Sequence, residues 1–358
     1  MYAVIFAGGA GTRLWPLSRQ RQPKQLHPLV SHRALLVESV ERLLPIIPKD
    51  HLLIQTTRKL LGACRRELPA IPRENFIVEP SQRNTGPAVG LAATLLHKRD
   101  KDAIIAALWS DHHIGRPEEF RKVLLTAERV ITKHPQSLVT VGINPTEPST
   151  AYGYIHMNTR SETVGQQRIF RVKRFVEKPD LSTAKRYVRS WRYLWNAGYF
   201  IFRAETMLDL MKRYAPGISR GLRAISDTFG TPKATTVLER EYLKFPNISI
   251  DYLIAEKAEE MYVVPADLEW SDIGTWASLH EILAIKGNTR VISKGHHVGH
   301  GDEDVLVYAR DKLVATVGLK NVVVVDTPDA LLVLNKDRAQ DIRHLIEKLK
   351  SGGKSRYL

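Results

Sequence analysis

A glycine-rich segment near the N-terminus contains the residues with the clearest capacity for chemistry. It follows a short apolar stretch and is made of glycines, a threonine and two cations: Gly8, Gly9, Gly11, Thr12, Arg13 and Lys24. Glycines allow backbone N–H groups to approach an anion closely, and such a turn forms a concave anion nest. Two fixed cations beside the turn would neutralise phosphate charge. The segment therefore predicts a triphosphate-binding turn, and we expect the chain to bind a nucleotide.

The spacing of this segment excludes two familiar nucleotide-binding motifs. No Lys–Ser/Thr pair follows the glycines, so the P-loop pattern is absent. Gly11 is followed by Thr12, Arg13 and Leu14, which breaks the dinucleotide-binding pattern G-x-G-x-x-G. The remaining alternative is a tight glycine turn with Arg13 in solvent, and the cations that follow favour the binding site over that alternative.

Alternating strand and helix patterns surround the glycine segment and define the elements that must position it. In the first half we expect strands over 2–6, 51–55, 75–79, 103–109 and 137–143, with helices over 35–44, 57–68, 86–98 and 117–132. This repetition predicts an α/β fold with a doubly wound, Rossmann-like sheet. In such sheets ligands bind beyond the carboxyl ends of the strands. The glycine turn, Glu79 and Asp111 all fall at such ends.

The pattern changes twice further along the chain. Over 151–283 strands at 152–157, 168–177 and 195–202 alternate with helices at 182–190, 204–214 and 249–259. Beyond residue 286 short strands are separated by turns and followed by a helix over 338–349. We therefore expect a catalytic domain over residues 1–285 and a small β-rich domain over 286–358.

Composition limits the classes of partner and the cellular compartment. The chain has 358 residues and a net charge of +15, but its cations are scattered and form no dense tract. We therefore expect no nucleic-acid partner, and a filter-binding assay at physiological salt tests the alternative. Apolar runs are strand-length and no signal peptide is evident, so we expect no membrane association. The single Cys64 fits a reducing compartment, and we expect a cytoplasmic protein with Cys64 in the core.

Ten motifs occur in one order from end to end and resemble the sugar-1-phosphate nucleotidylyltransferases, most closely the mannose-1-phosphate guanylyltransferases. They are the runs over 7–18, 23–25, 79–85, 110–112, 152–155, 175–179, 195–198, 249–252, 270–274 and 325–330. The resemblance implies transfer of GMP from GTP to α-D-mannose 1-phosphate, giving GDP-mannose and pyrophosphate. It also implies that the small domain is like a left-handed β-helix and forms a homodimer. Trp109 and Gly86 depart from the family pattern, which more often has proline and alanine there.

The resemblance assigns roles to individual residues on the nucleotide side. Arg13 and Lys24 would bind the triphosphate, and Lys178 would hold the sugar phosphate beside the α-phosphate. Guanine would be read by the segment that contains Glu79, Arg83 and Thr85. A sugar phosphate is already largely dianionic at neutral pH, so the reaction needs positioning and charge neutralisation instead of a general base.

The resemblance also implies a Mg²⁺ site and a sugar site. Asp111 and Asp272 would hold Mg²⁺, although as a helix cap Asp272 would have an ordinary structural role. The sugar-binding residues would be Gly153, Glu177, Asn196 and Asp251. For Asp251, support of the sugar pocket and capping of a helix over 252–259 are equally good interpretations.

Three other interpretations stay open. The chemistry could act on another sugar 1-phosphate or another nucleoside triphosphate, or the chain could be a non-catalytic homologue that only binds sugar nucleotides. His296, His297 and His300 lack the spacing of a zinc site, and we expect them in turns and on the surface. His112 and His113 are adjacent, so we expect their side chains to point in different directions.

Overall fold

The computed structural model describes residues 1–9 and 11–358, and Ala10 of the glycine turn lies outside the described residues. The chain divides into two compact units. We call one the sheet unit; it comprises residues 1–8, 39–110 and 114–270. We call the other the β-helix unit; it comprises residues 9–38, 111–113 and 271–358. This division differs from the domain limits expected at 285/286, because the loop at 9–38 groups with the C-terminal residues.

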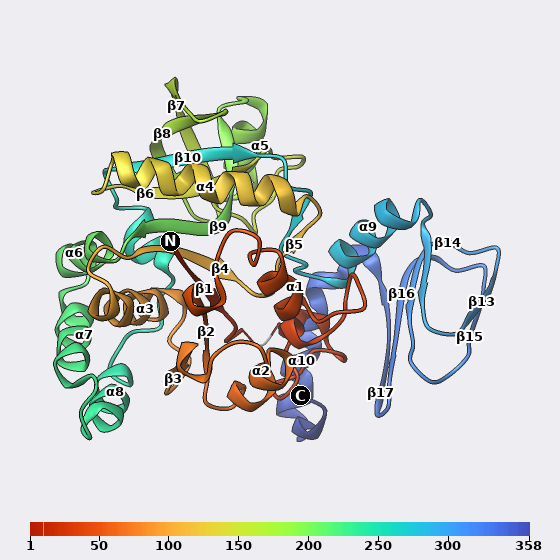
Figure 1. Ribbon diagram of the computed structural model, residues 1–358. Helices are drawn as coiled ribbons and strands as arrows, with labels where there is room; N and C mark the ends of the chain where they lie inside the picture. Colours follow the sequence, from red (N-terminus) through yellow and green to blue (C-terminus); the bar gives the residue numbers. More distant parts are fainter. Residues whose placement is uncertain (10) are drawn as a thin grey trace. The chain divides into compact units, whose positions relative to one another are not determined.

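A mixed nine-stranded sheet forms the centre of the sheet unit (Figure 1). Its strand order is β3-β2-β1-β4-β9-β6-β10-β8-β7. The strands are β1 Tyr2–Phe6, β2 Leu52–Thr57, β3 Phe76–Glu79, β4 Ile104–Trp109, β6 Leu138–Ile143, β7 Tyr154–Val164, β8 Gln167–Val176, β9 Tyr193–Arg203 and β10 Met261–Ala266. β1 pairs in parallel with β2 and β4, and β9 runs antiparallel between β4 and β6. The parallel half explains the near-continuous apolar runs in the sequence, because both of its faces are covered.

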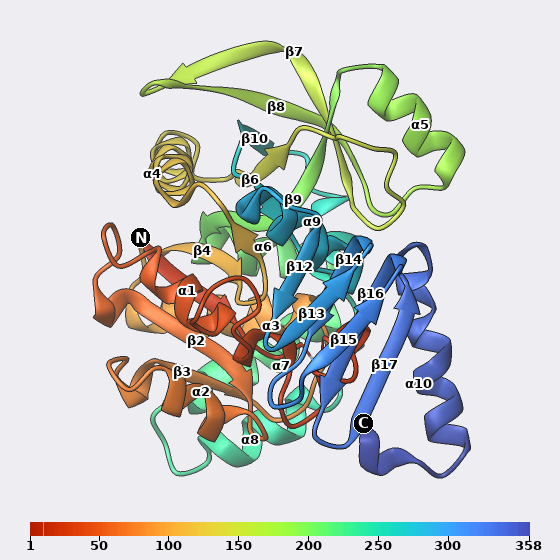
Figure 2. The same ribbon diagram turned by 90° about the vertical axis from the view of Figure 1, so that its right-hand side faces the viewer.

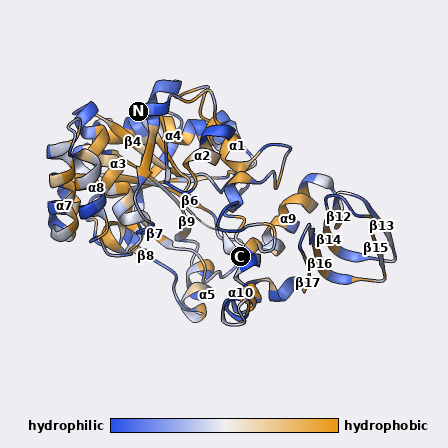
Figure 3. Cartoon of the chain, turned by 90° about the horizontal axis from the view of Figure 1, so that it is seen from below, coloured by the Kyte–Doolittle hydropathy of each residue, from blue (hydrophilic) through white to orange (hydrophobic). Residues whose placement is uncertain are grey.

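Helices cover this sheet. They are α2 Leu61–Glu67, α3 Thr85–Arg99, α4 Pro117–Lys133, α5 Leu181–Arg189, α6 Ala204–Tyr214, α7 Pro216–Thr228 and α8 Ala234–Tyr242. α1, Leu35–Glu41, spans the boundary between the units. Figure 1 shows α3, α6, α7 and α8 gathered together, and Figure 3 shows α3 as largely apolar. α3 is apolar on most sides because ten of its residues, Val89 and Leu91 among them, are buried.

The β-helix unit contains short parallel strands that alternate between two sheets. The first sheet has the order β12-β14-β16-β17, and the second pairs β13 with β15 (Figure 2). Their bounds are β12 Val291–Lys294, β13 His297–His300, β14 Glu303–Tyr308, β15 Val314–Val317, β16 Lys320–Thr327 and β17 Ala330–Asn335. β12, β14 and β16 pair in parallel, as do β13 and β15, which is the pairing of successive β-helix turns. Helices α9 Trp276–Gly287 and α10 Ile342–Ser351 belong to the same unit.

The expected fold class is confirmed, with a few local errors. The sequence analysis missed α7, α8, β10 and β13, and the helix expected over 249–259 is only a five-residue π-helical turn, Asp251–Ala255. Two-residue strands at His113–Ile114 and Trp270–Ser271 were also missed. No helix among the described residues is both long and apolar enough to cross a membrane.

Candidate active site

The predicted site residues fall into two sets, one in each unit. The sheet unit holds Gly8 of the predicted triphosphate turn and the residues predicted for base, sugar and sugar-phosphate binding: Glu79, Arg83, Thr85, Gly153, Glu177, Lys178, Asn196 and Asp251. The β-helix unit holds those predicted for the triphosphate and the metal: Gly9, Gly11, Thr12, Arg13, Lys24, Asp111 and Asp272.

Gly11 is the glycine on which the turn depends. Its φ is +58°, and a Cβ there would lie 2.4 Å from the Cβ of Lys24 and 3.0 Å from the Ser18 hydroxyl. Gly8 and Gly9 do not have positive φ, so the expectation of conformational freedom holds for Gly11 alone among these three. The turn then continues into a 3₁₀ helix, Thr12–Leu14, which contains Arg13. A side chain at position 11 would therefore displace the predicted triphosphate-binding lysine.

Lys24 joins the two predicted metal ligands. Its side chain is only 4% exposed, and its ammonium lies 2.9 Å from Oδ2 of Asp111 and donates to the backbone carbonyl of Asp272. Burial acts to raise the pKa of Asp111, but Lys24 and His112 outweigh it and hold that pKa below its usual range. Asp111 is therefore ionised at neutral pH, as a Mg²⁺ ligand must be.

Arg13 and the Asp272 carboxylate meet beside Gly274. A Cβ at Gly274 would lie 2.9 Å from Oδ2 of Asp272 and 3.3 Å from Nη1 of Arg13. The Gly274 N–H donates to Oδ1 of Asp272 at 3.0 Å. Asp272 does not cap the following helix: Thr275 is the N-cap of α9 and forms a reciprocal capping box with Ser278. The alternative interpretation of Asp272 as a helix cap is therefore wrong.

The predicted base-side residues are held by a segment near α8. Glu79 is buried, and its Oε2 accepts a hydrogen bond from the Tyr242 hydroxyl at 2.6 Å. Burial raises the pKa of Glu79, while hydrogen bonds from Tyr242 and Gln55 oppose that rise. Arg83 donates to the Leu243 carbonyl at 2.5 Å. The sequence analysis missed Tyr242, because it predicted no helix at 234–242.

Thr85 has a structural contact that its predicted role did not include. Its hydroxyl accepts a hydrogen bond from the N–H of Ile250 at 2.8 Å. Asn84 caps α3, and its side chain accepts from the Thr85 N–H. Thr85 therefore fixes the start of α3, and nucleotide contact by this residue stays a prediction.

The predicted sugar-binding residues converge around Glu177. A Cβ at Gly153 would lie 2.5 Å from Oε2 of Glu177 and 3.4 Å from Cβ of Asn196, so a side chain there would displace the Glu177 carboxylate. That Glu177 oxygen is buried and has no hydrogen-bond partner among the described residues. The Lys178 ammonium pairs with the other Glu177 oxygen, and Lys178 has a φ of +46°. An orphaned buried acceptor in a polar cluster is what a ligand hydroxyl would satisfy.

Asp251 contributes to this cluster and does not cap a helix. Its carboxylate accepts from the Asn196 side-chain amide at 3.1 Å, and the π-helical turn that begins at Asp251 has no side-chain cap. Burial and the nearby Glu177 carboxylate raise the pKa of Asp251 to about 7. Burial tends to lower the pKa of Lys178, but Glu177 and Asp251 raise it above its usual range. The capping interpretation is therefore wrong, and support of a sugar pocket by Asp251 stays a prediction.

Two further expectations concern Cys64 and the histidines. Cys64 is fully buried, as expected, and its pKa is raised by that burial. His297 differs from a surface histidine, because its ring contacts the Thr316 hydroxyl at 2.7 Å and its side chain is 8% exposed.

One three-residue group of metal-ligating side chains occurs in the described part of the chain: His280, Glu281 and Asp304. The Lys336 ammonium donates to all three side chains. A resident ammonium therefore takes the position that a cation would need, and this group is an ion-pair network.

Comparisons with known proteins identify the family of the chain. Residues 2–287 match the nucleotidyl transferase family, and residues 295–349 match the mannose-phosphate isomerase/GMP-like β-helix domain. A mannose-1-phosphate guanylyltransferase of Salmonella muenchen is 36% identical over 358 residues, which is 99% of this chain and 74% of that protein. One from Escherichia coli K12 is 37% identical over 100% of this chain and 75% of that protein.

A solved structure is also similar over nearly the whole chain. It comes from Thermus thermophilus and is described as a mannose-1-phosphate geranyltransferase. Its sequence is 34% identical, its TM-score is 0.87, and the match covers 98% of this chain and 99% of that one.

Proposed function

Because the chain belongs to the mannose-1-phosphate guanylyltransferase family of nucleotidyl transferases, we propose that it transfers GMP from GTP to α-D-mannose 1-phosphate. The products are GDP-mannose and pyrophosphate. Membership of this family makes the chain a nucleotidyltransferase. The identity of the nucleotide, the metal and the reaction geometry are the parts of the proposal that need testing.

The reaction is an in-line displacement at the α-phosphorus. An oxygen of the dianionic sugar phosphate forms the new bond to that phosphorus, and the bond to the β-phosphate oxygen breaks as pyrophosphate leaves. No proton must be removed from the nucleophile, because its second pKa lies near 6. The protein therefore has to orient two anions and neutralise their charge.

The cluster around Lys24 is the observation that carries this proposal. Arg13 and Lys24 lie beside the Asp111 and Asp272 carboxylates, so cations for phosphate oxygens and ligands for a divalent ion occur together. The donor set of two carboxylates suits Mg²⁺, and Asp111 is ionised. When bound, Mg²⁺ would supply further neutralisation of phosphate charge. Arg13 and Lys24 would bind the departing pyrophosphate.

The sugar side of the proposal is supported by the cluster around Glu177. Its buried, unpartnered oxygen is an acceptor for a sugar hydroxyl, and Gly153 leaves room for the ring to approach. Asn196 donates one amide N–H to Asp251 and keeps its second for a ligand. Lys178, which is half exposed, would hold the sugar phosphate.

The direct test measures pyrophosphate release with each of the four common nucleoside triphosphates and several sugar 1-phosphates, with and without Mg²⁺. We expect turnover with GTP and mannose 1-phosphate only when the metal is present. Equal rates with all four nucleotides would contradict guanylyl transfer. Absence of turnover with every pair would support a non-catalytic binding protein.

We also propose that the chain forms a homodimer through the β-helix unit. Several large apolar side chains of that unit are at least 60% exposed: Val298, Leu313, Val317, Leu331 and Val333. These side chains support an interface on this unit, because association would remove their apolar surface from water. Light scattering during gel filtration tests the proposal, and a monomer at micromolar concentration would contradict it.

A further inference from the structure

Residues 79–86, here called the base-side segment, pack against residues 242–250, here called the bracing segment. Hydrogen bonds join them at four places: Tyr242 to Glu79, Arg83 to the Leu243 carbonyl, Ile250 to Thr85, and Gly86 to the Ile248 carbonyl. Every residue predicted to read the base therefore contacts the bracing segment. The conformation of one segment depends on that of the other.

Gly86 shows how close this approach is. A Cβ at Gly86 would lie 2.7 Å from the Ile248 carbonyl oxygen and 2.9 Å from a methyl group of Leu253. The contact to the carbonyl is closer than real Cβ atoms show, so alanine would force the two segments apart. The departure from the family pattern at this position thus has a physical reason.

The contact between Tyr242 and Glu79 has the clearest functional consequence. Tyr242 is fully buried, Glu79 is 6% exposed, and the phenol donates to Oε2 at 2.6 Å. The other oxygen, Oε1, lies 3.9 Å from the position of a Cβ at Gly8, which is ordinary contact distance. One carboxylate oxygen is therefore fixed by α8, while the other faces the start of the glycine turn.

A hydrogen bond of this kind holds both the charge and the orientation of a buried carboxylate. A bond to a charged group contributes more than a neutral one, and its loss leaves a buried acceptor unsatisfied. Without the phenol, Oε2 of Glu79 would lose its donor from α8, and the hydrogen bond from Gln55 would be left to hold the carboxylate.

We propose that Tyr242 is a positioning residue for nucleobase recognition, which fixes the Glu79 carboxylate so that Oε1 accepts from the N1–H and 2-amino edge of guanine. This inference rests on the proposed function. Adenine presents an acceptor at N1, so a fixed carboxylate rejects it. Tyr242 itself does not touch the nucleotide, and its effect is exerted through Glu79.

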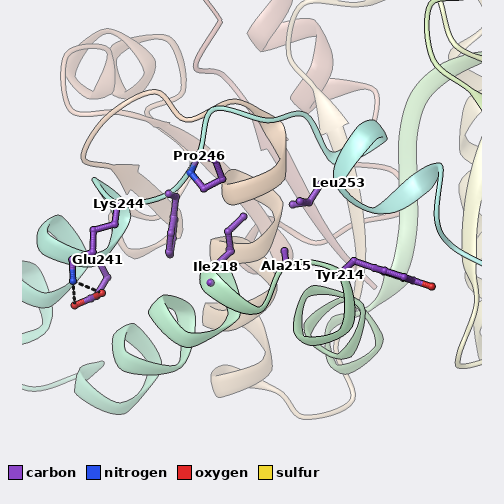
Figure 4. Close-up of a pocket in the computed structure, with 9 residues that line it drawn as sticks. Tyr214, Ala215, Ile218, Glu241, Lys244, Pro246 and Leu253 are labelled. Atoms are coloured by element: carbon purple, nitrogen blue, oxygen red, sulfur yellow. Dashed lines mark hydrogen bonds and ion pairs between the residues drawn. The ribbon is translucent and has the colours of Figure 1, made fainter.

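A cavity lies beside the bracing segment, and substitution of one residue that lines it can loosen the packing around Tyr242 without removing the Tyr242 hydroxyl. It has a volume of about 410 Å³ and includes Glu241, Lys244, Phe245 and Pro246 in its lining (Figure 4). The Phe245 ring packs edge-on against Tyr242 with 5.3 Å between centroids. Shortening Phe245 loosens this packing but leaves the phenol of Tyr242 in place.

The experiment compares GTP, ITP and ATP as substrates for the wild type and Tyr242→Phe by pyrophosphate release. We expect the ratio of kcat/KM for GTP to that for ATP to fall about tenfold, because the variant loses one charge-assisted hydrogen bond. The change should come from a higher KM for GTP, with the KM for mannose 1-phosphate within twofold. The kcat/KM for ITP, whose base lacks the 2-amino group, should fall less than the kcat/KM for GTP.

Matched controls remove a hydroxyl or loosen the packing elsewhere. Tyr2 is buried, and its hydroxyl bonds to the Asp100 carboxylate at the opposite end of β1, so Tyr2→Phe should leave base discrimination unchanged. Phe245→Leu should lower the melting temperature and keep the GTP/ATP ratio within twofold. A loss of discrimination in Phe245→Leu equal to that in Tyr242→Phe would overturn the proposal.

A double-mutant cycle tests whether Tyr242 acts through Glu79. In a Glu79→Gln background, Tyr242→Phe should cause no further loss of discrimination. If Tyr242→Phe does not fold, Glu79→Gln alone must lower the ratio, and an unchanged ratio overturns the proposal. A wild type without preference for GTP would contradict the proposed function. A wild type that prefers GTP, with Tyr242→Phe preferring it equally, would overturn only this inference.

Discussion

Burial acts on the predicted functional carboxylates of both compact units, but their neighbours differ. In the sheet unit, burial raises the pKa of Glu79 and raises that of Asp251 to about 7. In the β-helix unit, Lys24 and His112 outweigh the same effect and keep the pKa of Asp111 low. The carboxylates predicted to bind the base and the sugar thus keep a raised pKa, whereas the carboxylate predicted to bind a metal is paired with a cation that lowers its pKa.

The largest expected effect on kcat comes from the predicted metal ligands of the β-helix unit. Asp111→Asn and Asp272→Asn should each lower kcat by about 10³-fold, since each removes a charged ligand from the phosphate-binding cluster. The measurement is pyrophosphate release at saturating substrate. Asp329→Asn in the same unit is the control, because Asp329 forms an exposed pair with Arg19 and a long hydrogen bond from Thr327. Full turnover in either active-site variant would contradict the proposed metal site.

A somewhat smaller effect on kcat is expected from Lys24, the cation that lowers the pKa of Asp111. Lys24→Gln should lower kcat about 10²-fold and raise the pKa of Asp111, because its main counter-charge is lost. Since that pKa is now below its usual range, Asp111 stabilises the fold above about pH 4, and this stability falls as the pH drops. Urea unfolding between about pH 3 and 6 should therefore show a shallower pH dependence for the variant. An unchanged dependence would show that Lys24 does not hold Asp111 ionised.

In the sheet unit, the pH dependence of stability is expected to have the opposite sign. The pKa of Asp251 is raised to about 7, so its contribution to stability is fully present below about pH 4 and is lost as the pH rises towards 7. Asp251→Asn should remove this loss, which is on the order of 2–4 kcal/mol. Unfolding free energies of the wild type and the variant, measured in urea at several pH values, provide the test. Parallel curves would mean that Asp251 ionises normally.

The smallest expected effect separates helix capping from metal binding. Thr275→Ala should lower the free energy of unfolding by about 1 kcal/mol, because it removes the N-cap of α9. Asp180→Ala, which removes the cap of α5 in the sheet unit, should cost a similar amount and leave kcat unchanged. A larger stability loss in Asp272→Asn than in Thr275→Ala would return a structural role to Asp272.

Local patterns predicted most of the fold but not its irregular elements. Buried strands such as β1 and β4 are continuous apolar runs, and α6 was predicted with its observed bounds of Ala204–Tyr214. β13 was missed because His297–His300 is polar and contains a glycine, and its hydrogen bonds come from parallel pairing with β15. α7 had a readable signal in Pro216 at its first turn with Ile218, Leu222 and Ile225 buried along one face.

The candidate site was predictable only where motifs are short and local. Gly11, Arg13 and Lys24 lie close together in the chain, and the positive φ of Gly11 accords with their spacing. Tyr242 lies 163 residues from Glu79, so no spacing rule links the two. The loop at 9–38 also groups with the C-terminal residues, which is a long-range packing preference that no local pattern encodes.

The indole of Trp15, two residues beyond Arg13, donates to the carbonyl of Tyr357 at 2.7 Å, across 342 positions of the chain. A ribosome therefore synthesises the predicted phosphate-binding loop among the first residues and its hydrogen-bond partner among the last described ones. This hydrogen bond can form only after residue 357 has been synthesised. A nascent chain stalled before residue 357 would present the glycine turn without this tether, and so should bind nucleotide more weakly than the released protein.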